Sequence, residues 1–193
     1  MGDLSHGTPW KPILLRSATA AAFGILTIFW QAPGIGVLSA AGGLYLLLTA
    51  VAVWRMSVLA GTNGQARVRS LQLLEAAVYA VAGLAVLALR TVEVFFAAAG
   101  AALLVGGAVE LYLWAKARGA FLPARDWLIT GAVSLGTAAI LAAVMAMDLG
   151  AQAMLGVTGG SAIIIAVVLA TSGLGARWDA GSKVPAAAVR EKP

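Results

Sequence analysis

Six stretches of this chain are each long and apolar enough to cross a lipid bilayer, and they limit what the chain can become. A bilayer core about 30 Å thick needs about 20 apolar residues in a helix that rises 1.5 Å per residue. The composition agrees, because 61% of the residues are hydrophobic and only 11% are charged, compared with about 25% charged in soluble domains. The sequence therefore predicts an all-α integral membrane protein, with spans at 13–30, 35–54, 71–89, 92–114, 127–147 and 149–174.

The ends of the chain differ from this membrane domain, which we expect to cover residues 13–174. Residues 1–12 form a predicted cytoplasmic N-terminal tail, and residues 61–70 a cytoplasmic linker between two spans. Residues 175–193 are polar and mixed in charge, a composition typical of disordered segments. We therefore expect a disordered cytoplasmic tail there.

The chain has a net charge of +5, and the positions of its basic residues indicate how it crosses the membrane. If the six spans alternate in direction, only Arg90 of the 13 Lys and Arg residues falls on the side opposite the others. The positive-inside rule then places both termini in the cytoplasm. The expected partner is the lipid bilayer and not nucleic acid, while a membrane-protein partner or a homo-oligomer is left open.

The sequence also repeats itself. The segments LLRSATAAAFGIL (14–26), LLEAAVYAVAGLA (73–85) and LITGAVSLGTAAI (128–140) align, and the following spans align through Gly43, Gly100 and Gly160. This pattern predicts three two-helix hairpin repeats, at about 13–54, 71–114 and 127–174. Because each repeat contains an even number of spans, the three repeats enter the membrane in the same direction and are parallel.

Small residues recur four positions apart along several of these spans. In lipid, small residues at this spacing let helix backbones approach closely. The expected helix-packing glycines are Gly24, Gly43, Gly83, Gly100, Gly106, Gly107 and Gly160.

Three ionisable residues, Arg16, Glu75 and Glu110, fall inside predicted spans near their cytoplasmic ends. A charged side chain costs about 2.5 to 3.5 kcal/mol at the bilayer centre and less near its edge. Arg16 could pair with Glu75, Glu110 or both and fix the packing of the repeats. Alternatively, one glutamate could exchange a proton during a response or a transport step, or the charged groups could reach water without a partner. The sequence leaves these interpretations open.

Residues for common catalytic chemistry are absent or badly placed. The chain has no cysteine, and its one histidine, His6, lies in the N-terminal tail. Nucleophilic sites that use a cysteine or histidine are therefore not expected, and no cluster has metal-ligand spacing. We expect a protein that is not an enzyme and has no catalytic residues, no metal site and no cofactor.

The repeat segments quoted above resemble the HdeD-like acid-resistance family of bacterial six-span membrane proteins. The resemblance covers most of residues 14–169 and differs from the family pattern at Thr49, Ala50, Ala76 and the second and third extracytoplasmic turns. The resemblance implies a role in acid or envelope stress in the bacterial cytoplasmic membrane but supplies no catalytic residues. The matching positions are Arg16, Gly24, Pro33, Gly43, Tyr45, Glu75, Gly83, Gly107, Glu110 and Trp127.

Two functions remain as expectations. The first is a non-enzymatic multi-pass membrane protein of acid or stress resistance. The alternative is transport of protons or a small solute through the interface between the repeats. A hydrated path along that interface would favour transport, whereas a dry, glycine-packed centre would favour the first function.

Overall fold

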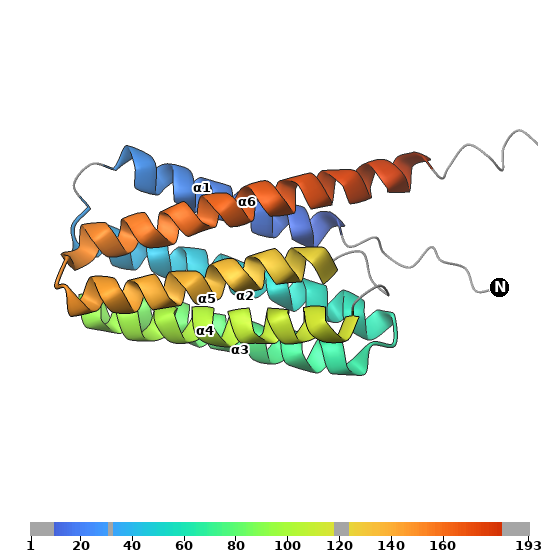
Figure 1. Cartoon of the computed structure of the whole chain (residues 1–193), viewed down its shortest axis with the longest axis horizontal. Coiled ribbons are helices and arrows are strands. Elements are labelled where there is room, and N and C mark those ends of the chain that lie inside the picture. The colour runs from blue at the N-terminus through green and yellow to red at the C-terminus, as the bar shows by residue number, and fades with distance from the viewer. Residues whose placement is uncertain (1–9, 31–32, 118–123, 183–193) are drawn as a thin grey trace, which may run out of the picture.

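The computed structural model of the chain describes residues 10–30, 33–117 and 124–182. Within these ranges the chain forms six helices and no strand (Figure 1). Each helix contains a stretch long and apolar enough to cross a membrane, so the prediction of an all-α protein with six such helices is confirmed. The helices are α1 (Trp10–Phe29), α2 (Ile35–Thr62), α3 (Ala66–Leu89), α4 (Val92–Ala117), α5 (Ala124–Ala146) and α6 (Gly150–Ser182).

Tight turns end α3 and α5 and start the helices that follow. Arg90 and Asp148 both adopt a left-handed backbone, with φ of 51° and 52°, which reverses the chain within a few residues. The side-chain oxygen of Thr91 accepts a hydrogen bond of 3.2 Å from the amide of Val94 and so caps the start of α4. As a result, α4 runs back alongside α3, and α6 runs back beside α5 (Figure 1).

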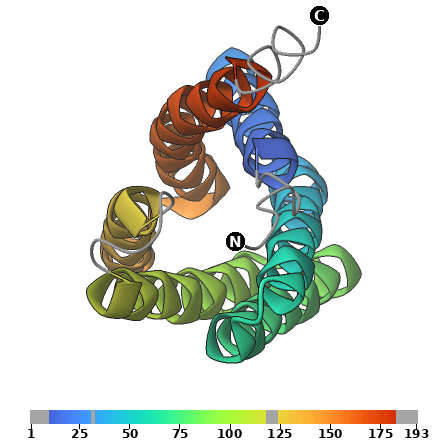
Figure 2. The ribbon, with the colours of Figure 1, turned by 90° about the vertical axis from the view of Figure 1, so that its right-hand side faces the viewer.

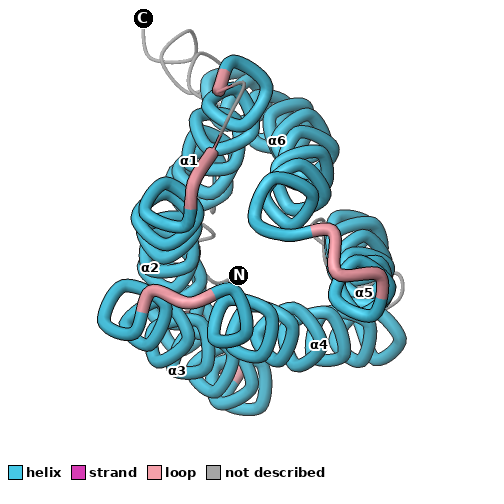
Figure 3. Tube along the Cα trace, turned by 90° about the vertical axis from the view of Figure 1, so that its left-hand side faces the viewer, coloured by secondary structure: helices cyan, strands magenta, loops and turns pink. Residues whose placement is uncertain are grey.

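Viewed along the bundle, the six helices form a ring (Figures 2 and 3). We call the end where α1, α3 and α5 begin the basic end, and the other end the opposite end. The closest helix packing joins α2 to α3, α4 to α5, and α6 to α1. The tightest contacts therefore lie between successive hairpins, and the two helices within a hairpin pack less closely. Described basic residues at the basic end are Lys11, Arg16, Arg55, Arg67, Arg69, Lys116, Arg125 and Arg177.

A pair of glycines lies at each of these three tight helix contacts. A methyl group added to Gly24, Gly83 or Gly107 would lie 3.0, 2.8 or 2.9 Å from the carbonyl oxygen of the facing glycine. Such distances leave almost no room for a side-chain carbon, so glycine permits the helix backbones to approach this closely. The pairs are Gly24 with Gly159, Gly43 with Gly83, and Gly107 with Gly131.

The prediction that Gly100 and Gly160 are packing glycines was wrong. A methyl group added to either residue would have no neighbour within 4 Å. The contact on α6 falls on the adjacent residue, Gly159, and the contact on α4 falls two helical turns further along, at Gly107. Gly106 packs against a side chain, because a methyl group there would lie 2.7 Å from the hydroxyl oxygen of Tyr79.

Two expectations about non-helical segments also need correction. The expected linker at 61–70 is largely helical, because α2 continues to Thr62 and α3 begins at Ala66. Only a short turn separates them, with Gly64 at a φ of 72°. The expectation of a disordered tail at 175–193 is wrong for residues 175–182, because α6 continues to Ser182; residues 1–9 and 183–193 lie outside the described residues.

Large apolar side chains divide between the interior of the ring and its outer surface. The most deeply buried ones include Phe95, Leu141, Met154 and Leu155, each 1% exposed or less. Many others, such as Val81 at 68%, point outward, which suits a surface that faces lipid acyl chains. Apolar side chains therefore make up most of the interior. The buried ionisable groups described next are exceptions.

Candidate functional site

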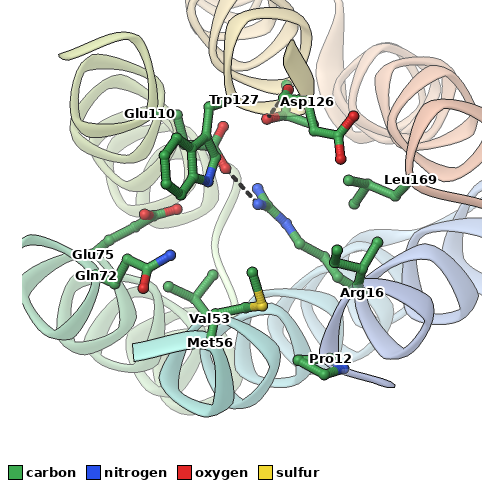
Figure 4. Close-up of a pocket in the computed structure, with 12 residues that line it drawn as sticks. Pro12, Arg16, Val53, Met56, Gln72, Glu75, Glu110, Asp126, Trp127 and Leu169 are labelled. Atoms are coloured by element: carbon green, nitrogen blue, oxygen red, sulfur yellow. Dashed lines mark hydrogen bonds and ion pairs between the residues drawn. The ribbon is translucent and has the colours of Figure 1, made fainter. Parts of the chain in front are cut away.

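A cluster of ionisable side chains lies inside the ring near the basic end. It contains Arg16 of α1, Glu75 of α3 and Glu110 of α4, each more than one helical turn from the end of its helix (Figure 4). Glu75 and Glu110 are 2% and 1% exposed, and the Arg16 side chain is 13% exposed. The three residues of the predicted charge cluster therefore lie together, and they are largely shielded from the surroundings.

Arg16 reaches across the interior to Glu110. Its Nη1 atom donates a hydrogen bond to Oε1 of Glu110, so the two side chains form a hydrogen-bonded ion pair. α1 packs mainly on α6 and α2, whereas α4 packs mainly on α5 and α3. The ion pair therefore links two helices that are not neighbours in the ring. Of the pairings that the sequence left open, the structure has Arg16 with Glu110, with Glu75 beside them.

Three buried oxygen atoms near this ion pair have no hydrogen-bond donor. They are Oε1 of Glu75, Oε2 of Glu110 and Oε1 of Gln72. A buried acceptor without a donor costs about 1 to 3 kcal/mol. Because all three atoms are acceptors, they cannot satisfy one another, and the cluster is short of hydrogen-bond donors.

These side chains line one small cavity, shown in Figure 4, to which all six helices contribute lining residues. The space open to the centre of a water molecule is about 30 Å³, and about 10 to 15 Å³ is enough for one water. The cavity therefore has room for water beside the unsatisfied oxygens. A water molecule or a protonated carboxyl group would supply the missing donors.

The cavity wall carries more acidic groups than basic ones. Among its described lining residues, Arg16 is the one cation, whereas Glu75, Glu110 and Asp126 are carboxylic acids. If all three acids were ionised, the charges would not balance, and burying an unbalanced charge is costly. Binding a proton would reduce this excess negative charge, so the arrangement is chemically suited to proton uptake.

Asp126 was not among the predicted site residues. It lies in the first turn of α5 and is 8% exposed, and its Oδ2 accepts a hydrogen bond of 2.5 Å from the hydroxyl of Ser172 on α6. The sequence stripe of α5 through Thr130 could have revealed it, because Asp126 is one helical turn earlier on the same face. The hydroxyl of Thr130 donates to the backbone carbonyl of Asp126 at 2.8 Å. Both residues line the cavity.

Toward the opposite end, the interior contains few ionisable groups. The rings of Phe23 and Tyr45 stack with centroids 4.4 Å apart, and beyond them lies an apolar space of only about 10 Å³, bordered by Phe95 and Leu103. Within the described helices, Glu93 in the first turn of α4 is the one ionisable residue between this level and the turns at the opposite end. The polar cavity is therefore not continued by ionisable groups through the other half of the bundle.

The described residues contain no group of three or more His, Cys, Asp or Glu side chains placed to hold a metal ion. Comparison with protein-family models, with curated proteins and with solved structures gave no match for this chain.

Proposed function

We propose that this chain is a non-enzymatic protein of the bacterial cytoplasmic membrane that acts in acid or envelope stress resistance. In this proposal the cluster of Arg16, Glu75 and Glu110 binds a proton when the surroundings become acidic. The observation that carries the proposal is the group of buried acceptor oxygens without donors beside a single cation. The resemblance to the HdeD-like family supports the link to acid stress.

A proton at this cluster would change the partner of Arg16. Protonation of Glu110 would remove the negative charge that holds the guanidinium across the bundle. Glu75 lines the same cavity and offers a second carboxylate, so the ion pair can exchange partners between α4 and α3. Because this pair links helices that are not neighbours, such an exchange would alter how the helices of the basic end are held together.

Charged and titratable groups from five helices surround this exchange. They would influence which carboxyl group takes the proton and how strongly it is bound. Asp126 is held by Ser172, so it is less free than Glu75 to accept Arg16. The groups are Arg16 on α1, Tyr45 on α2, Glu75 and Tyr79 on α3, Glu110 on α4 and Asp126 on α5.

The structure favours this response over conduction, the alternative function raised by the sequence. A conducting protein needs a chain of water or exchangeable groups across the membrane. Here the interior beyond the cavity at the basic end contains an apolar pocket of about 10 Å³, and the described helices place no ionisable group between this pocket and Glu93 in the first turn of α4. We therefore propose a protein that takes up a proton at one end without passing it through.

Proton flux into liposomes tests this distinction. Liposomes containing the wild type, Glu75→Gln or Glu110→Gln would be compared with empty liposomes under an imposed pH gradient. We expect no protein-dependent flux, together with lower survival in acid of cells that carry either variant in place of the wild type. Flux that either substitution abolishes would instead establish a transport function at this cluster, and full acid survival of both variants would contradict the proposal.

We also propose that the six helices are three parallel hairpin repeats with both termini in the cytoplasm. The recurring glycine contacts between successive hairpins support the repeats, and the concentration of Lys and Arg at the basic end supports the orientation. Labelling of single introduced cysteines from either side of the membrane tests the orientation. Reaction of a cysteine at Arg67 from the outside would contradict it.

A further inference from the structure

A groove of about 750 Å³ lies at the basic end between the start of α1 and the second half of α2. It is separate from the cavity of the charge cluster, and Pro12 is the one described residue that lines both. Its volume is within the range of about 300 to 1,000 Å³ that is typical of sites for small ligands. The lining residues are Trp10, Lys11, Pro12, Trp54, Arg55, Val58 and Leu59.

The groove is positively charged and rich in tryptophan. Lys11 and Arg55 line it, and no acidic residue is among its described lining residues. Above the ring of Trp10 lie two cations, with Nζ of Lys11 5.5 Å and Cζ of Arg177 5.6 Å from its centroid. Arg55 forms no ion pair with the described residues. The groove is therefore suited to a ligand with negative charge.

An apolar stripe leads along the outside of α2 to this charged groove. Leu44, Leu48 and Val51 are 53%, 38% and 41% exposed, and Val58 is 47% exposed. Together with Arg55, these residues recur at intervals of four and three positions, so they share one face of the helix. An acyl chain lying along this stripe would bring its headgroup to Arg55.

We propose that this groove binds an anionic phospholipid, with its phosphate at Lys11 and Arg55 and an acyl chain along the α2 stripe. Trp10 and Trp54 would lie at the boundary between headgroup and acyl chains, where amphipathic indole rings prefer to be. A zwitterionic lipid fits less well, because the described groove offers no carboxylate to receive its ammonium group. This inference does not depend on the proposed response to acid.

The test compares lipids retained by the detergent-solubilised full chain, counted by native mass spectrometry. Phosphatidylglycerol and phosphatidylcholine with identical acyl chains are the two probes. The groove variant is Lys11→Gln with Arg55→Gln, and Arg67→Gln with Lys116→Gln is a control that loses the same charge at the same end. Arg55→Gln alone is a milder variant, because this side chain is exposed and has no ion-pair partner among the described residues.

We expect the wild type and the control to retain phosphatidylglycerol in preference to phosphatidylcholine. A cation near the membrane surface contributes up to about 1 kcal/mol to binding an anionic lipid, so the groove variant, which loses two cations, should bind it up to about 30-fold more weakly. Arg55→Gln should show a smaller loss in the same direction. Equal retention of both lipids, or equal loss in the groove variant and the control, would overturn the proposal. Displacement by free glycerol phosphate at the same concentration would also overturn it, because it would indicate a site for a soluble phosphate.

Discussion

Replacing Arg16 by methionine tests whether the buried charge cluster is held together as described. Methionine keeps an unbranched side chain but removes the one cation among the described residues that line the cavity. The carboxyl groups of Glu75 and Glu110, 2% and 1% exposed, would then have no positive partner there. Removal of one partner from a buried ion pair costs about 3 to 5 kcal/mol, and we expect Arg16→Met to lower the free energy of unfolding by that amount.

The glutamate partner should be easier to replace. In Glu110→Gln, Arg16 keeps a carboxylate within the same cavity, namely Glu75. We therefore expect a loss of about 1.5 to 3 kcal/mol, the range for one hydrogen bond to a charged group. The double variant Arg16→Met with Glu110→Gln should be less destabilised than the sum of its parts by about 0.5 to 3 kcal/mol, since the two residues interact directly.

Reversible unfolding in mixed micelles with increasing denaturing detergent measures these free energies. Arg67→Met is the matched control, because Arg67 is an exposed residue at the same end of the bundle and should change the free energy by no more than about 0.5 kcal/mol. Equal losses for Arg16→Met and Arg67→Met would refute the reasoning. Additive losses in the double variant would likewise show that Arg16 and Glu110 do not stabilise one another.

Three further substitutions test the helix packing and the hydrogen bond to Asp126 in the same unfolding assay. Gly83→Ala places a methyl group 2.8 Å from the carbonyl oxygen of Gly43 and should cost about 1 to 3 kcal/mol. Gly100→Ala, with no neighbour within 4 Å, should cost nothing measurable, so similar losses would contradict the contact. Ser172→Ala removes the donor to the buried Asp126 and should cost about 1 to 3 kcal/mol; unchanged stability would show that this hydrogen bond contributes little.

The sequence predicts the helices well because lipid imposes strict limits on length and polarity. All six expected spans lie largely within observed helices, since a helix satisfies the backbone hydrogen bonds of an apolar segment from within that segment. The placement of Arg16, Glu75 and Glu110 at a common depth also follows from their positions within the spans. Helical periodicity then brings them to faces that pack together.

Details that depend on how one helix meets another could not be predicted in the same way. Gly107 was predicted correctly, but the alignment of repeats also selected Gly100 and Gly160 and missed Gly159, because small shifts of one helix along its neighbour change which residue is closest. The role of Asp126 was missed because its partner, Ser172, is 46 residues away in the sequence. The choice of Glu110 over Glu75 also depends on a contact across the bundle that no local pattern encodes.

Proton binding by the buried carboxyl groups is the central claim, and infrared difference spectroscopy measures it most directly. Spectra of the protein in lipid nanodiscs at neutral and acidic pH would be compared for the wild type, Glu75→Gln and Glu110→Gln. The control is Glu93→Gln, because Glu93 is an exposed residue in the first turn of α4. We predict that acidification produces a signal from a protonated buried carboxyl group that Glu93→Gln retains and that Glu75→Gln or Glu110→Gln abolishes. A signal unchanged in both cluster variants would contradict the account, because the proton would then bind elsewhere.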